Sequence, residues 1–165
     1  MIRKAVLVDI DQIMDILNKT KAEMHSYNNF QWDKNYPNRE DFINDIKKEN
    51  LYCIEHEKSI AGFVCANTTQ PIEYNGLNWS STKEAMVIHR MSVNPEFRQK
   101  GIGTKLIKFV ERLAIKNNIE YLKTDTYSLN VKMNNLFKKC GYNFIGEMNF
   151  LGKEKPFYCY DIIIK

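Results

Sequence analysis

The segment that begins at Ala85 constrains the fold of this chain most strongly, because it joins an apolar run, a glycine-containing turn and an amphipathic stretch. The run from Ala85 to Val93 predicts a buried strand, and Asn94-Pro95 ends it because proline lacks an amide donor and restricts the residue before it. From Ile102 onward, apolar residues recur at helical spacing. The first N–H groups of a helix have no partners within it and carry the positive end of its dipole. A strand, a glycine turn and a helix in this order therefore predict a site for an anion.

The turn between this strand and this helix is suited to a phosphate group. Gly101 and Gly103 let the backbone approach such a group closely, since glycine has no side chain. Three basic side chains accompany them: Arg98, Lys100 and Lys105. The P-loop pattern does not match, because its lysine precedes a Ser or Thr, whereas here Thr104 precedes the lysine. The dinucleotide-binding pattern does not match either, because Leu106 stands where it needs a third glycine.

Three motifs together resemble a known family. Arg98-x-x-Gly101-x-Gly103 is similar to the acetyl-CoA signature R/Q-x-x-G-x-G/A of the GNAT acetyltransferase superfamily. Met91-Ser92-Val93-Asn94-Pro95 resembles the family's L-x-V-x-P at its usual distance, and Asn130-x-x-Met133-x-x-Leu136-Phe137-x-x-x-Gly141-Tyr142 resembles its N-x-x-A-x-x-L-Y-x-x-x-G-F. These motifs cover about the C-terminal half of the chain.

The elements expected along the chain have the order of that fold. Strands are predicted at residues 2–8, 51–57, 59–67, 85–93, 121–126, 142–148 and 157–164, and helices at about 10–24, from Asn38 onward, from Ile102 onward and at 131–140, where Gly141 ends the last helix. Residues 68–83 read as a polar loop. The order βααβββαβαββ predicts one α/β domain over residues 1–165, with a mixed, mostly antiparallel sheet flanked by helices, as in the GNAT fold.

Composition excludes several other classes of protein. The net charge of +4 is too small to argue for nucleic acid, and no apolar stretch is long enough to cross a bilayer. The apolar run after Met1 is broken by two aspartates, so it does not read as a signal peptide. The four cysteines have no metal-site spacing and are expected to be reduced and mostly buried. We therefore expect a cytoplasmic protein that binds neither nucleic acid, membrane nor metal; its oligomeric state stays open, with a homodimer as one alternative.

The resemblance implies acetyl-CoA as co-substrate and assigns residues to it: Met91, Ser92, Val93, Arg98, Gln99, Lys100, Gly101, Ile102, Gly103, Thr104, Asn130, Asn134 and Phe137. The turn would hold the diphosphate. The backbone of Met91 and Val93 would pair with the pantetheine arm where the strand at 85–93 parts from the strand at 121–126. For Asn130, the role of a helix N-cap is about as well supported as a contact with the pantetheine arm.

The implied reaction, acetylation of an amine, needs a base, because an alkylammonium with a pKa of about 10.4 has no lone pair with which to attack. His89 is the first candidate for the base, and a hydrogen-bonded core histidine is its equally weighted alternative. Glu84, Glu73 and Asp125 are further candidates, although Glu73 is expected to be merely solvated. The backbone N–H near Val93 would polarise the thioester carbonyl.

Phe137 departs from the family pattern, because many members use a tyrosine at this position as the acid that protonates the leaving thiolate. Tyr127 or Tyr142 could serve instead, or no acid is needed, since a thiol with a pKa of about 8.5 leaves readily as its anion.

For the acceptor, a small-molecule or peptide amine, we expect contacts from Trp32, Tyr36, Trp79, His89 and Asp125. Aromatic rings attract a cationic amine, but packing is the favoured explanation for most of them, which include Tyr27, Phe30, Tyr158 and Tyr160. The alternative function is a catalytically silent acyl-CoA-binding or sensor domain of the same fold.

Overall fold

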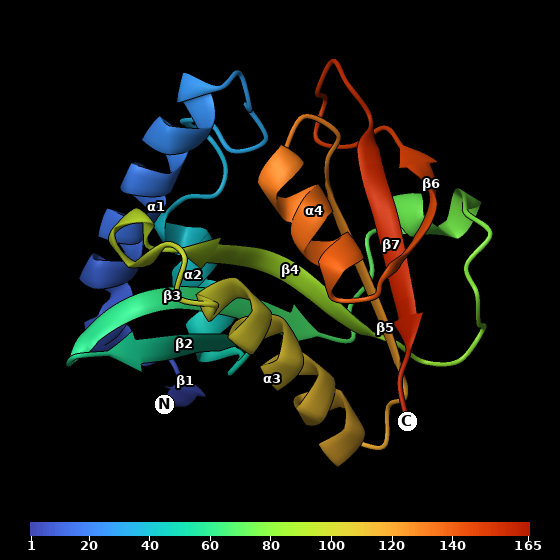
Figure 1. The fold of residues 1–165 in the computed structure, drawn as a ribbon, viewed down its shortest axis with the longest axis horizontal. Coiled ribbons are helices and arrows are strands. Elements are labelled where there is room, and N and C mark those ends of the chain that lie inside the picture. The colour runs from blue at the N-terminus through green and yellow to red at the C-terminus, as the bar shows by residue number, and fades with distance from the viewer. The chain divides into compact units, whose positions relative to one another are not determined.

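The computed structural model describes all residues 1–165 and contains a mixed, mostly antiparallel sheet flanked by helices (Figure 1). The sheet has seven strands in the order β1-β2-β3-β4-β5-β7-β6. The strands are β1 (Ile2–Lys4), β2 (Leu51–His56), β3 (Ser59–Asn67), β4 (Met86–Val93), β5 (Tyr121–Tyr127), β6 (Asn143–Met148) and β7 (Phe157–Ile163). The helices are α1 (Ile10–Ser26), α2 (Arg39–Lys47), α3 (Ile102–Lys116) and α4 (Val131–Lys139). The predicted fold class and element order are confirmed.

The chain forms two compact units. The first unit comprises residues 1–66 and 90–106, and the second comprises residues 67–89 and 107–165. Both β4 and α3 contribute residues to each unit.

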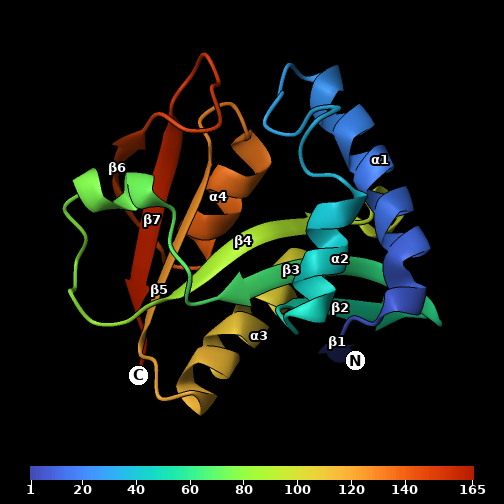
Figure 2. The ribbon, with the colours of Figure 1, turned by 180° about the vertical axis from the view of Figure 1, so that it is seen from behind.

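In the first unit, helices pack on a β-hairpin. β2 and β3 pair antiparallel, as the sequence predicts, and β1 adds to the β2 edge. α2 covers one face of this hairpin, where Phe42 meets Phe63 edge to face, and α3 begins on the other face (Figures 1 and 2). A Cβ at Gly62 would lie 2.8 Å from Ser92 O and 3.3 Å from the Ile102 side chain. Glycine at this position therefore lets the start of α3 pack directly against β3.

The N-terminal strand is shorter than predicted. β1 ends at Lys4, and a 3-10 helix, η1 (Leu7–Asp9), replaces the expected strand residues. The Asp9 carboxylate accepts hydrogen bonds from the Val6 amide at 2.8 Å and from both terminal nitrogens of Arg3. This local bonding turns the chain toward α1 and leaves Val8 at 86% exposure, so the strand prediction for residues 5–8 is wrong.

In the second unit, β7 pairs antiparallel with both β5 and β6. β4 is parallel to β5 over Met86–Ile88, and this described register ends at the pair of Ile88 and Thr124. α4 packs on one face, where Phe137 contacts Tyr160. The other face carries a 3-10 helix, η2 (Ile72–Gly76), which the sequence analysis missed within the expected polar loop. Its Tyr74 is 1% exposed and belongs to the core of this unit.

Other local predictions are confirmed. Asn38 caps α2 through its side chain, which accepts the Asp41 amide at 3.1 Å, and Gly141 follows α4 with a φ of 89°. All four cysteines are free and buried, and burial raises the pKa of the Cys65 and Cys159 thiols to about 12. No helix of the chain combines the length and the apolar character needed to span a membrane.

Candidate active site

The turn before α3 has the backbone shape of an anion site. A 3-10 helix, η3 (Pro95–Phe97), ends β4, and two residues of the turn then adopt positive φ, Gln99 at 63° and Gly101 at 70°. The Lys105 amide makes the first helical hydrogen bond, to Gly101 O at 3.0 Å. The amides of α3 before Lys105 therefore have no carbonyl partner within the helix. A Cβ on Gly101 would meet no atom within 4 Å, which leaves space above the turn. Such turns form concave surfaces of N–H groups that suit phosphate.

Arg98 adds a second observation at this turn. Its guanidinium donates to Glu23 Oε1 at 2.5 Å, which fixes the side chain against α1. Its Nε–H is buried and has no hydrogen-bond partner. A buried donor without an acceptor is costly, and an anionic ligand at the turn would supply the acceptor.

The candidate residues on α4 already make contacts within the protein. The Asn130 side chain accepts the Met133 amide at 3.2 Å, which is the N-cap role. Asn134 Nδ2 donates to Tyr127 O and Asn130 O, and its Oδ1 accepts from the Tyr160 hydroxyl. Asn134 therefore stabilises the start of α4, and a role toward the pantetheine arm stays a prediction for both asparagines.

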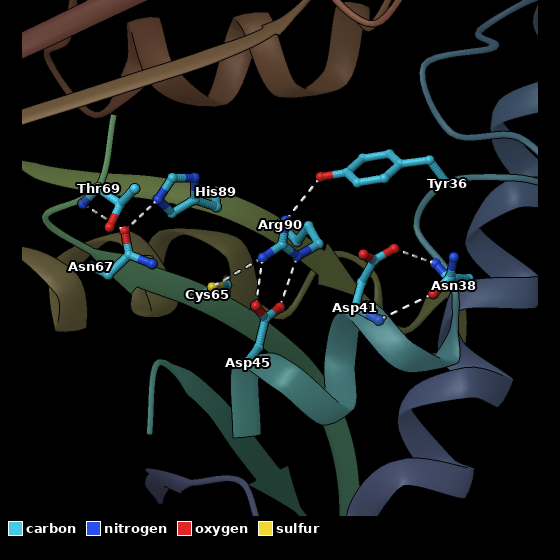
Figure 3. A network of polar contacts seen from close by, with 9 residues as sticks. All are labelled: Tyr36, Asn38, Asp41, Asp45, Cys65, Asn67, Thr69, His89 and Arg90. Atoms are coloured by element: carbon cyan, nitrogen blue, oxygen red, sulfur yellow. Dashed lines mark hydrogen bonds and ion pairs between the residues drawn. The ribbon is translucent and has the colours of Figure 1, made fainter. Parts of the chain in front are cut away.

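His89 lies on β4 and is half-buried. Its Nε2 lies 2.6 Å from Asn67 Oδ1, and the same oxygen accepts the Thr69 amide at 2.9 Å (Figure 3). Val87 lies opposite Lys123 in the parallel register, and side chains alternate along a strand. His89 therefore projects from the same face of the second unit as Lys123 and Asp125.

Asp125 on β5 forms a hydrogen bond with a tyrosine and is affected by the charge of a second carboxylate. The Tyr74 hydroxyl donates to Asp125 Oδ2 at 2.5 Å. Burial raises the pKa of Asp125 to about 6; the Tyr74 hydrogen bond acts against this shift, and the Glu73 charge adds to it. Glu73 Oε2 is buried without a hydrogen-bond partner, so the expectation that Glu73 is merely solvated is wrong. An ammonium group would relieve both carboxylates.

The predicted aromatic residues have different surroundings. Trp32 is 5% exposed in the hydrophobic core of the first unit, which favours packing. Trp79 is half-buried and donates its Nε1–H to Tyr74 O at 2.8 Å. Lys123 Nζ lies over the Trp79 ring, 4.5 Å from its centroid. Burial lowers the pKa of Lys123.

Tyr36 belongs to a charged network in the first unit (Figure 3). Its hydroxyl accepts from Arg90 Nη1 at 2.9 Å, and Arg90 forms a two-point ion pair with Asp45. Burial alone would lower the pKa of Arg90, but the bonds to Asp45 raise it above its usual value.

The structure also describes the two tyrosines considered as acids. The Tyr142 hydroxyl faces Glu111 at 3.3 Å, and burial together with this carboxylate raises its pKa far above the usual value. The Tyr127 hydroxyl accepts the Lys155 amide at 3.2 Å. A raised pKa makes Tyr142 a poorer proton donor, and Phe137, which is 1% exposed, has no hydroxyl.

Sequence reasoning missed Asn67, Tyr74 and the pair of Arg90 and Asp45. Asn67-Thr68-Thr69 does carry a signal, because asparagine commonly accepts the amide two residues later. The other three residues find their partners far along the chain, where no local pattern points to them.

Comparison with known proteins identifies the family of the chain. Residues 10–142 match the family model described as the acetyltransferase (GNAT) family. Streptothricin acetyltransferase of Escherichia coli is 27% identical over 120 residues, which cover 73% of this chain and 64% of that protein. The chain thus spans less than two thirds of the curated relatives that it matches, 34% and 64% of their lengths.

Solved structures share the fold over the whole chain. A GNAT-family acetyltransferase from Streptococcus agalactiae superposes with a TM-score of 0.88 at 23% identity and covers 100% of this chain and 95% of its own. The protein yncA from Salmonella typhimurium, solved with its cofactor acetyl-CoA, superposes with a TM-score of 0.73 at 12% identity and covers 100% of this chain and 94% of its own. The family model covers most of the sequence, and the chain therefore belongs to the GNAT acetyltransferase family.

Proposed function

We propose that this protein transfers the acetyl group of acetyl-CoA to a primary amine by direct attack, without a covalent enzyme intermediate. The observation that carries the proposal is the turn from Arg98 to Thr104, with its two positive φ angles and the buried, unpartnered Nε–H of Arg98. Membership of the GNAT family supports the same chemistry.

The residues of the turn fit the diphosphate of coenzyme A. The amides from Gln99 to Thr104 would donate to its oxygens, and Arg98 Nε would gain an acceptor. The backbone of Met91 and Val93 would hold the pantetheine arm, because the described register of β4 with β5 ends before them, at Ile88.

In the proposed mechanism, His89 removes the proton from the acceptor's ammonium group, since only about one alkylamine in a thousand is neutral at pH 7. The Val93 N–H donates to the carbonyl oxygen of the thioester. Acetyl-CoA supplies the activated acyl group, whose C–S bond breaks as the new C–N bond forms. The first ammonium proton rests on His89 until solvent takes it up, and the second, which the nitrogen loses as the amide forms, passes through water to the departed CoA thiolate.

We propose a small-molecule amine as acceptor, in keeping with the name of the streptothricin acetyltransferase relative. Asp125, with its raised pKa and its neighbour Glu73, would attract the ammonium group. Within the second unit, Trp79 would contact the remainder of the acceptor, whereas a contact from Tyr36 stays a prediction.

Phe137 favours a second candidate, a silent acyl-CoA-binding sensor, because it lacks the hydroxyl that the family pattern implies at this position. Release of free CoA thiol from acetyl-CoA across a panel of amines separates the two. The transferase requires release that depends on an amine and falls by about 10²- to 10⁴-fold in His89→Gln. Binding of acetyl-CoA with no release for any amine indicates the sensor.

A further inference from the structure

The Asn67 side chain has a fixed orientation. Its Oδ1 accepts the Thr69 backbone amide at 2.9 Å, and a backbone N–H can only donate (Figure 3). The atom that faces Thr69 must therefore be the oxygen, and the terminal amide cannot be reversed without placing N–H against N–H.

This orientation determines which nitrogen of His89 carries hydrogen. His89 Nε2 lies 2.6 Å from the same oxygen, which can only accept. Nε2 must therefore be protonated, and in the neutral ring the lone pair belongs to Nδ1.

We propose that Asn67 is a positioning residue that holds His89 in the Nε2–H tautomer, so that Nδ1 is the nitrogen that takes the acceptor's proton. The catalytic part of this inference rests on the proposed function, whereas the tautomer does not. A neutral amide suits the task, because it orients the ring without a negative charge. A carboxylate at the same position would favour the imidazolium ion, which has no lone pair.

Several titratable groups share the face from which His89 projects: Lys123 and Asp125 on β5 and Glu73 and Tyr74 on η2. They are the same in every variant of residue 67, so a difference between variants reports on residue 67 itself.

The test reads the tautomer directly in the protein without substrate. Long-range proton–nitrogen correlation spectra of protein with isotopically labelled histidine distinguish protonated from unprotonated ring nitrogens above the titration of His89. The wild type is expected to show a protonated Nε2 and an unprotonated Nδ1 in His89. The signals of His25 and His56, the other two histidines, serve as internal controls.

Two variants test the role of the side chain. Asn67→Ala is expected to populate both tautomers and to lower kcat/KM about tenfold, the equivalent of one hydrogen bond. Asn67→Asp is expected to keep the tautomer but to raise the pKa of His89 by about one unit. The limb of the kcat/KM pH profile that His89 controls should then shift to higher pH by the same amount. Thr69→Ala keeps the backbone amide and is the matched control, with the wild-type spectrum and rate.

An Nδ1–H tautomer in the wild type overturns the inference, and so does an Asn67→Ala variant with unchanged tautomer and rate. If Asn67→Ala does not fold, the wild-type spectrum and Asn67→Asp still decide. If the wild type transfers no acetyl group, the proposed function fails while the spectrum still decides the tautomer.

Discussion

Arg90 on β4 and Asp45 on α2 form a two-point ion pair inside the first unit. Arg90 Nε and Nη2 donate to the two carboxylate oxygens at 2.8 and 2.6 Å, and the side chains are only 17% and 9% exposed. Arg90 Nη1 also donates to the Tyr36 hydroxyl. The pair therefore links β4, one residue after His89, to α2 and to the loop that carries Tyr36.

Removing one partner of this pair should destabilise the protein strongly. Asp45→Ala leaves a buried guanidinium without its counter-charge, and we expect the free energy of unfolding to fall by about 3 kcal/mol in urea titrations. Asp11→Ala is the matched control. Asp11 forms an ion pair at 2.9 Å with Arg39, which lies on α2 as Asp45 does, but the Asp11 side chain is 85% exposed. The control should change stability by less than about 1 kcal/mol. Equal effects of the two variants would contradict this account.

Asp125 should make stability depend on pH in a defined direction. Burial raises its pKa to about 6 in the folded protein, whereas an unperturbed aspartate has a value of about 3.9. The folded state therefore binds an extra proton between these values. The stability that this proton contributes is fully present below about pH 4 and is lost as the pH rises through about 6.

Asp125→Asn removes this dependence. As the pH rises from about 4 to about 7, the free energy of unfolding of the variant should increase by about 2 kcal/mol relative to that of the wild type. Urea unfolding at the two pH values measures this change. Tyr74→Phe deletes a hydrogen bond that lowers the pKa of Asp125, so it should move the same transition to higher pH. A variant that instead loses stability relative to wild type as the pH rises would exclude the raised pKa.

The lack of a hydroxyl at Phe137 predicts how kcat depends on pH in the alkaline range. Without a tyrosine acid at this position, the thiolate leaves unassisted, which its pKa of about 8.5 allows. We expect kcat to stay level at high pH. A steep fall with an apparent pKa near 10 would show that a phenol must be protonated, and Tyr127 or Tyr142 would then need to be reconsidered.

The regular parts of the fold could be predicted from sequence because their signals are local. Apolar spacing, Asn38 as a cap and Gly141 as a helix end each act within a few residues. The short β1 was predicted wrongly, because the apolar residues 5–8 look like strand, whereas the local hydrogen bonds of Asp9 to Val6 and Arg3 favour a turn.

For the candidate site, sequence could point only to the local part, whose ligand role stays a prediction. The turn at 98–104 is one continuous stretch, so its motif could be read directly. The surroundings of His89 and Asp125 depend on Asn67 and Tyr74, which lie 22 and 51 residues away from them in sequence. Chain folding creates these pairs, and no periodic pattern encodes them.

The central claim, that the turn at Arg98–Thr104 binds a diphosphate, is tested most directly by calorimetric titration of wild type, Gly101→Ala and Gly152→Ala with coenzyme A and with pantetheine, which lacks the diphosphate. Both glycines have positive φ, 70° and 63°, and open space at Cβ, so both alanine variants carry the same backbone strain, about 1 kcal/mol. We predict that only Gly101→Ala weakens coenzyme A binding, by about tenfold or more, and that it leaves pantetheine binding unchanged. Equal affinity of the wild type for the two ligands, or equal weakening in the two variants, would contradict the account.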